Sequence, residues 1–222
     1  MKTFINTKKV MHCFLNKIGV ILAKNNCANM ALVCNTHNYI LENETVLLRP
    51  LQTNDYAHLV LFALQEPTIW KYSMVPVVGQ DGLKNYIRTA LAQKASGTEY
   101  PFIIFYKRTL QYAGSIRFYD IQPTNKTWQL GYRWHGNRFQ GTGLNKNCKL
   151  LMLSFAFEEL GMERVEFRAD NRNKKSIAAI KNIGCVEEGV LRSHAVMANN
   201  ERRDSIVLNI LKKEKTEHQH SP

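Results

Sequence analysis

Two glycines and two lysines at the junction of a predicted strand and a predicted helix carry the clearest chemical signal in the sequence. The segment 131–146 reads GYRWHGNRFQGTGLNK, and Gly141 and Gly143 can adopt backbone conformations that let successive N–H groups converge. The following helix adds its unpaired N–H groups and the positive end of its dipole. Lys146 and Lys149 lie in its first turns, where cations are disfavoured unless an anion is bound. The segment therefore predicts a phosphate-binding loop.

Two common phosphate loops do not fit this segment. Gly136 and Gly141 have the spacing of a Walker loop, but Thr142 and Gly143 follow where that motif requires lysine and then serine or threonine. The Gly-Thr-Gly tripeptide matches the start of a dinucleotide-binding fingerprint, but Lys146 occupies the position of the third glycine. The remaining pattern is R-x-x-G-x-G, which neither motif explains.

The composition is that of one globular domain of ordinary size. Of the 222 residues, 45% are hydrophobic and 22% are charged, which suffices for a single core. The formal net charge is +12, and residues 1–41 contain five lysines and no acidic residue. A basic surface can attract nucleic acid, a ribosomal surface or an anionic cofactor, so charge alone leaves these partners open.

The cysteines and the N-terminal segment indicate a cytoplasmic protein. The five cysteines include no C-x-x-C pair and no histidine cluster accompanies them, so neither a disulfide framework nor a metal site is expected. A reducing compartment fits this pattern. The apolar run at 10–23 is interrupted by His12, Asn16 and Lys17, so it predicts no membrane-spanning segment. We predict that residues 1–40 form a basic, poorly ordered extension.

Hydrophobic periodicity predicts a mixed, α+β-like α/β domain over residues 41–211 and a solvated tail over 212–222. The expected strands are Thr45–Leu48, Tyr100–Tyr106, Tyr112–Tyr119, Thr127–Trp134, Arg164–Ala169, Val186–Val196 and Asp204–Leu211. The expected helices are 53–65, 81–97, 144–159 and one that starts at Asn173 and ends before Gly184. Alternation in the strand before the glycine loop predicts one shared side for Trp128, Leu130, Tyr132 and Trp134.

Several motifs in the same order resemble the GCN5-related N-acetyltransferase (GNAT) superfamily. RFQGTG at 138–143 is similar to that family's R/Q-x-x-G-x-G/A loop, and NKKS at 173–176 precedes IGC at 183–185 as in the family core. GVLRSH at 189–194 is similar to the subfamily related to ribosomal-protein N-terminal acetyltransferases. The resemblance covers residues 41–211.

The resemblance implies a single GNAT-type domain with helices on both faces of a central sheet. That sheet would be mostly antiparallel, twisted, and splayed at the cofactor site. Two residues depart from the family pattern. Gln129 stands where relatives often carry a glutamate, and Cys185 stands where they usually have an aromatic residue.

The resemblance also implies acetyl-CoA as co-substrate and acetyl transfer to a primary amine by direct attack in a ternary complex. Asn173 resembles the residue that reaches the pantetheine arm. Ser176 resembles the hydroxyl near the CoA sulfur, which could protonate the departing thiolate. Helix capping is the alternative role of both side chains. The residues expected to bind the cofactor are Tyr132, Arg133, Trp134, Arg138, Phe139, Gln140, Gly141, Thr142, Gly143, Leu144, Asn145 and Asn173.

The base that accepts the proton of the attacking amine is left open. A carboxylate or a histidine usually takes this role, and Gln129 cannot. His135 beside the loop and Glu166 on the neighbouring strand are the candidates. Glu99 and Asp120 stay as alternatives.

The connection between the first two helices, residues 66–82, is expected to select the acceptor. Trp70 and Tyr72 are its candidate substrate-binding residues. The subfamily resemblance implies a ribosomal or other protein N-terminus as acceptor, with small amines as the alternative. No membrane partner is expected, and the sequence leaves a monomer or a homodimer open.

Three functions compete on this sequence. The first is an acetyl-CoA-dependent N-acetyltransferase. The second is a noncatalytic acyl-CoA-binding module, motivated by Gln129 and by the unidentified base. The third is a basic nucleic-acid-binding protein, motivated by charge and by aromatic residues beside Arg117 and Arg133, although no nucleic-acid-binding motif accompanies them. We adopt the first.

Overall fold

One eight-stranded sheet organises the chain. The computed structural model describes residues 37–75, 77–197 and 200–218, and the strands follow the order β1-β2-β3-β4-β5-β6-β8-β7. The strands are β1 Leu41–Glu42, β2 Val46–Pro50, β3 Tyr100–Tyr106, β4 Gln111–Gln122, β5 Thr127–His135, β6 Arg164–Asp170, β7 Val186–Val196 and β8 Arg202–Leu211. The predicted mixed α/β fold with a mostly antiparallel sheet is confirmed.

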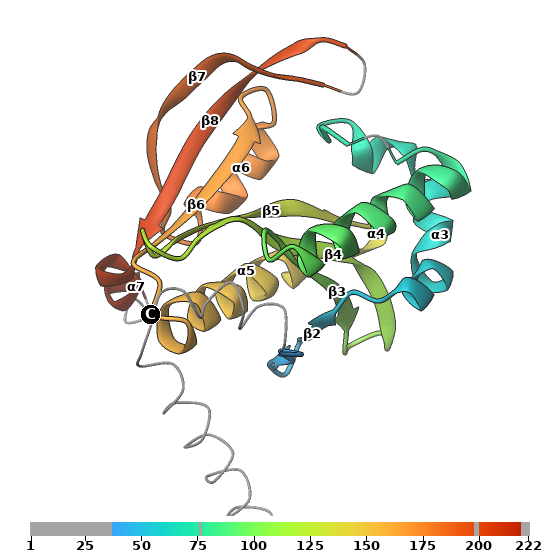
Figure 1. The fold of residues 1–222 in the computed structure, drawn as a ribbon, viewed down its shortest axis with the longest axis horizontal. Helices are drawn as coiled ribbons and strands as arrows, with labels where there is room; N and C mark the ends of the chain where they lie inside the picture. The colour runs from blue at the N-terminus through green and yellow to red at the C-terminus, as the bar shows by residue number, and fades with distance from the viewer. Residues whose placement is uncertain (1–36, 76, 198–199, 219–222) are drawn as a thin grey trace, which may run out of the picture.

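Helices cover both sides of this sheet (Figure 1). α3 (Tyr56–Gln65) and α4 (Gly79–Ala95) pack together on one side, and α5 (Leu144–Ser154) crosses the other. α4 is amphipathic, and its apolar stripe Leu83, Tyr86, Ile87 and Ala90 is buried. The remaining helices are α6 (Lys174–Lys181), α7 (Lys212–His218) and the short 3₁₀ turns η1 (Thr53–Asp55), η2 (Pro67–Trp70) and η3 (Asn137–Phe139).

β5 and β6 diverge at the centre of the sheet. They are the parallel pair, and every other neighbouring pair of strands is antiparallel among the described residues. Their last paired residues are Gln129 and Glu166, although β5 continues to His135 and β6 to Asp170. Backbone N–H and C=O groups therefore face an opening between the two strands, as the predicted splay requires.

A bulge in β5 determines which side chains face which side of the sheet. Tyr132 has a φ of 47°, and β5 has one residue more than β4 in this stretch. Trp128 contacts Phe118, which in turn contacts Phe155 at the end of α5.

Trp134 lies on the opposite side of the sheet from Trp128. Its ring packs against Phe62 of α3, Trp70 of η2 and Tyr86 of α4. The predicted shared side for Trp128, Leu130, Tyr132 and Trp134 is therefore wrong, because the bulge shifts the alternation by one residue.

The helix predicted over 144–159 is present and buried against the sheet. It starts at Leu144 as α5 and continues as a π-helical turn over Phe155–Glu159. Leu144, Cys148, Met152 and Phe155 are all buried. Gly161, with a φ of 68°, follows the end of the turn, as expected of a C-terminal cap.

The two ends of the described chain differ from the prediction. The Tyr39 ring lies 4.8 Å from that of Phe155, so ordered packing begins before residue 41, and residues 1–36 of the predicted extension lie outside the described residues. The predicted solvated tail begins with α7, where Lys215 Nζ donates to Ser154 Oγ at 2.9 Å. None of the described helices combines the length and the apolar character needed to cross a membrane.

Candidate active site

The glycine loop connects β5 to α5 through a tight backbone path. The N–H of Gln140 donates to Asn137 O at 3.0 Å, and Thr142 Oγ1 donates to Phe139 O at 2.8 Å. Gly141 and Gly143 have φ values of 76° and 81°, in the region that a Cβ atom disfavours. An added Cβ would meet no atom closer than 3.9 Å at either position. Glycine is therefore required by the backbone conformation and not by lack of space.

A groove of about 730 Å³, which we call the loop groove, lies between this loop and α6. Lys175 Nζ of α6 donates to Gln140 Oε1 of the loop at 2.6 Å. The basic side chains that line the groove are Arg133, His135, Lys146, Arg172, Lys174 and Lys175. Within the described part of the chain no acidic residue lines it. The loop groove therefore favours a ligand with several negative charges.

Arg133 and His135 form a polar pair inside this groove. Their Nη1 and Nδ1 atoms lie 2.8 Å apart. Burial, and then the charges of Arg133, Lys175 and Lys149, lower the pKa of His135 to about 3. The imidazole is therefore neutral near pH 7, and its Nδ1 can accept the hydrogen bond from Arg133.

A second cavity of about 180 Å³, the strand cavity, lies at the opening between β5 and β6. Residues 130–134 of β5 and 167–170 of β6 form its two sides. Trp70, Tyr72 and Tyr86 add aromatic side chains from the side of the sheet that carries α3 and α4. The two predicted acceptor-binding residues, Trp70 and Tyr72, therefore lie at one cavity.

The loop groove and the strand cavity meet. The residues that line both are Ile69, Tyr72, Arg133, Trp134, Asn173 and Ser176. A ligand in the groove can thus extend one end into the cavity, where it would meet a second ligand.

Asn173 and Ser176 are placed at this junction by the start of α6. Asn173 is the N-cap, and its Oδ1 accepts a hydrogen bond from Ser176 N at 3.1 Å. The capping role is therefore present, and the same turn puts Ser176 beside both cavities.

The structure separates the candidate bases from the strand cavity. His135 lines only the loop groove. Glu166 accepts hydrogen bonds from Arg168 Nε at 2.7 Å and Arg164 Nη2 at 3.0 Å, and it lines neither cavity.

The two alternative bases are also engaged elsewhere. Glu99 pairs with Arg117 at 2.5 Å, and Asp120 Oδ2 accepts from Gln129 Nε2 at 2.6 Å. Neither carboxylate lines the strand cavity.

Asp170 is a cavity carboxylate that the sequence prediction missed. It is buried at the end of β6 and pairs with Arg172 at 2.9 Å. Burial raises its pKa, but the hydrogen bonds and charge of Arg172 outweigh burial, so the pKa is lowered overall. The alternation of Glu166, Arg168 and Asp170 along β6 was the signal for it, one residue beyond the predicted end of the strand.

Lys149 occupies a different place from the one predicted for it. It is 3% exposed, its Nζ donates to Ala179 O at 3.1 Å, and it lines the strand cavity instead of the loop groove. Burial, with repulsion from Arg133, lowers the pKa of Lys149 to about 7. Its predicted role beside the anion loop is wrong, because this face of α5 turns toward α6.

The predicted cofactor residues divide into three groups. Those that line the loop groove are Arg133, Trp134, Gln140, Gly141, Gly143, Asn145 and Asn173. Tyr132 lines only the strand cavity. The remaining four line neither cavity. Phe139 and Leu144 are buried in the core, and Arg138 lies over the Phe139 ring. Thr142 stabilises the loop through the hydrogen bond from its Oγ1 to Phe139 O.

Comparison with known proteins identifies the family. Residues 45–186, more than half of the chain, match the family described as an acetyltransferase (GNAT) domain. The chain belongs to the GNAT family. It is therefore an acyltransferase of the N-acetyltransferase kind, which favours the first of the three competing functions.

Among its relatives is the putative ribosomal N-acetyltransferase YdaF of Bacillus subtilis (strain 168). The two proteins are 32% identical over 101 residues, which is 46% of this chain and 54% of YdaF. The chain thus aligns with about half the length of that relative.

Two solved GNAT structures extend the comparison. A GCN5-related N-acetyltransferase from Brucella melitensis has a TM-score of 0.75 at 21% identity, covering 83% of this chain and 86% of that one, which shows the shared fold. The microcin C7 self-immunity acetyltransferase MccE, in complex with acetyl-CoA and AMP, has a TM-score of 0.68 at 25% identity, covering 76% of this chain and 93% of its own.

The described residues include no group of three or more histidine, cysteine, aspartate or glutamate side chains that could hold an ion.

Proposed function

We propose that this protein is an acetyl-CoA-dependent N-acetyltransferase that forms a ternary complex with its amine acceptor. The observation that carries the proposal is the meeting of two cavities of different character at Ser176 and Asn173. The loop groove suits a long polyanionic ligand, and the strand cavity suits a smaller acceptor. The amine would attack the thioester directly, without a covalent intermediate on the protein.

The loop groove fits the phosphate groups of acetyl-CoA. The backbone N–H groups at residues 141–143 and the N-terminus of α5 would hold the pyrophosphate. Lys146, Lys174 and Lys175 line the groove and would neutralise the phosphate charges. The predicted cofactor residues Arg133, Arg138, Gln140, Gly141, Thr142 and Gly143 belong to this proposed site, partly through their backbone.

Acetyl-CoA would supply the activated acetyl group, and this chain would position it and handle the protons. Gly131–Trp134 would present unpaired backbone groups to the pantetheine, together with the Asn173 side chain. The Ser176 hydroxyl would donate a proton toward the sulfur of the thiolate. Because His135 and Glu166 lie away from the strand cavity, a water molecule would have to pass the proton from the amine to either of them. The lowered pKa of His135, about 3, also makes its imidazole a weak base.

The acceptor would enter from the side of Trp70 and Tyr72. The name of the relative YdaF refers to a ribosomal acceptor, and this supports a protein α-amino group as the acceptor here. A cytoplasmic location agrees with Cys148 and Cys185, which are free thiols. We assign this activity to the domain spanning residues 41–211.

Titration calorimetry with acetyl-CoA, followed by release of the CoA thiol with a panel of amines and peptide N-termini, tests the proposal. We expect stoichiometric binding and acceptor-dependent thiol release. Folded protein that fails to bind acetyl-CoA would contradict the proposal, and binding without release from any amine would contradict its catalytic part.

A further inference from the structure

Arg203 is a buried cation of the strand cavity, and Asp170 lines the same cavity. Arg203 is 5% exposed and lines the cavity near Tyr119 and Tyr132. None of the ion pairs formed by the described residues includes Arg203. A buried charge without a partner is costly, so the protein must gain from it elsewhere.

Two other arginines near the opening have carboxylate partners. Arg117 pairs with Glu99 at 2.5 Å and Arg168 with Glu166 at 2.7 Å.

The terminal nitrogens of Arg203 remain available to a ligand. Asp170 lines the same cavity and attracts Arg203, but both of its carboxylate oxygens accept hydrogen bonds from Arg172. Arg133, which lines both cavities, lies against His135 instead.

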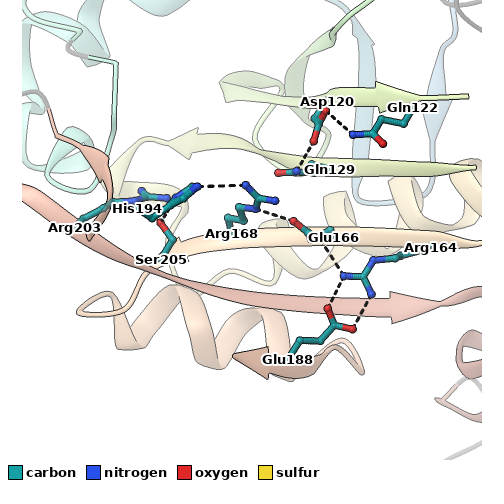
Figure 2. Close-up of polar contacts among 10 residues, drawn as sticks. All are labelled: Asp120, Gln122, Gln129, Arg164, Glu166, Arg168, Glu188, His194, Arg203 and Ser205. Carbon is teal, nitrogen blue, oxygen red and sulfur yellow. Dashed lines mark hydrogen bonds and ion pairs between the residues drawn. The ribbon is translucent and has the colours of Figure 1, made fainter. Parts of the chain in front are cut away.

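Ser205 fixes the direction of the Arg203 side chain. The fully buried Ser205 Oγ accepts a hydrogen bond from Arg203 Nε at 2.9 Å and lies 3.0 Å from His194 Nδ1. Figure 2 shows Arg203, Ser205 and His194 grouped together, with the Arg168–Glu166 pair beside them. With Nε held by Ser205, the two terminal nitrogens of the guanidinium can form the fork that binds a carboxylate or a phosphate.

The phosphate groups of acetyl-CoA have their own cationic site. The loop groove contains Lys146, Lys174 and Lys175, whereas Arg203 lies in the strand cavity and not in that groove. The anion that Arg203 would bind therefore belongs to the other ligand, the acceptor.

We infer that the amine acceptor carries an anionic group, a carboxylate or a phosphate, which Arg203 binds in the strand cavity. This inference rests on the proposed function and names the class of acceptor. A neutral amine would leave the two terminal nitrogens of the guanidinium without a hydrogen-bond acceptor among the described residues, whereas an anionic acceptor would bind them and be oriented by the fork.

Matched acceptors test the inference. The first arm compares peptides that begin Ser-Glu and Ser-Gln, and the second compares O-phosphoethanolamine with ethanolamine. The value of kcat/KM is measured by thiol release. Independently, the affinity of the CoA-loaded protein for the acetylated Ser-Glu and Ser-Gln peptides is measured by calorimetry. We expect an anionic preference of at least about tenfold in one arm, and that arm identifies carboxylate or phosphate as the group.

The Arg203→Gln variant decides whether Arg203 causes the preference. Arg203→Gln should bring the ratio of kcat/KM for the anionic acceptor to kcat/KM for the neutral acceptor close to one. Arg203→Lys should retain part of the wild-type preference. Arg202→Gln, at the exposed neighbouring residue, should keep the wild-type ratio. Ratios near one for the wild type in both arms, or a ratio that Arg203→Gln leaves unchanged, would overturn the inference. An Arg203-dependent difference in peptide affinity without any thiol release would support the anion site and contradict the proposed function instead.

Discussion

Gln129 of β5 is paired with Glu166 of β6, and no described residue pair joins the two strands beyond this position. Both side chains are anchored by polar contacts. Gln129 Nε2 donates to Asp120 Oδ2 at 2.6 Å, while Glu166 accepts from two arginines. The start of the opening between the strands is thus held by fixed hydrogen bonds on both sides.

Gln129→Glu should destabilise the protein. Gln129 is buried, and a carboxylate there would face Asp120 without a compensating donor. We expect a loss of about 2 kcal/mol in the free energy of unfolding, measured by urea denaturation. Adding Asp120→Asn should recover most of it. Gln122→Glu, an exposed change at another Asp120 contact, is the control, and an equal loss there would contradict the explanation.

Gly143→Ala should weaken acetyl-CoA binding by about tenfold. An alanine at a φ of 81° costs roughly 1–2 kcal/mol, and relief of that strain would turn the loop N–H groups away from the ligand. Gly161→Ala is the matched control, because Gly161 has a φ of 68°, an equally open surrounding and a position outside both cavities. Both variants should lose similar stability in thermal unfolding. Equal acetyl-CoA affinity in the two variants would show that the loop is not part of the acetyl-CoA binding site.

Ser176→Ala should lower kcat by about a hundredfold while changing acetyl-CoA affinity much less. The hydroxyl would act on the developing thiolate, which exists only during transfer, whereas the N-cap bond uses the Ser176 backbone N–H and survives the change. Steady-state thiol release and calorimetry give the two quantities. Ser96→Ala, at the exposed residue that follows α4, serves as control. An unchanged kcat would remove Ser176 from the mechanism.

Lys149→Met should stabilise the protein at pH 7 and flatten the pH dependence of its stability. The pKa of Lys149 falls from an ordinary value of 10.5 to about 7, mainly through burial. Between these values the unfolded chain binds the proton more tightly, so this lysine destabilises the fold fully below pH 7 and ceases to do so above pH 10.5.

Thermal unfolding of Lys149→Met and wild type from pH 6 to pH 10 checks this expectation. We expect the variant to melt about 2–4 °C higher at pH 7, with the difference shrinking as pH rises. Lys146→Met, at an exposed position on the same helix, should show no such trend. A difference that grows with pH would show that the charge of Lys149 is not the cause.

Trp70→Ala should change the acceptor profile while leaving acetyl-CoA affinity nearly intact. The Trp70 ring lines the strand cavity and lies 4.6 Å from that of Trp134, so its removal enlarges the acceptor side. The expected readout is a higher KM for the preferred acceptor and weaker discrimination among amines. Trp70→Phe should behave as an intermediate. If Trp70→Ala left the relative kcat/KM values for the tested amines unchanged, the acceptor would not be selected by residues 66–82.

The elements with a strong local pattern could be predicted from the sequence. β3 is an unbroken apolar and aromatic run, and β6 and the helix over 144–159 have apolar residues at regular spacing, so the local pattern was enough to predict them. The glycine loop could also be predicted, because the positive φ of Gly141 and Gly143 favours glycine over other residue types.

The arrangement of the site depends on features that residue type does not predict. Tyr132 has a positive φ although it is not glycine, so its residue type gave no indication of the bulge that turns Trp134 to the opposite side of the sheet. Asp170 and Arg203 come together only because β6 and β8 are neighbours in the sheet, a pairing that joins segments far apart in the chain. Burial of Lys149 likewise depends on how α5 and α6 pack.

The bulge gives β5 residues that line different cavities. Tyr132 lines only the strand cavity and His135 only the loop groove, while Arg133 and Trp134 line both. Substitutions at Tyr132 can therefore change the strand cavity while the loop groove stays unchanged, which would allow the two cavities to evolve separately. Deleting a single residue here would restore simple alternation and exchange the two sides, so the length of this short stretch is as constrained as any side chain in it.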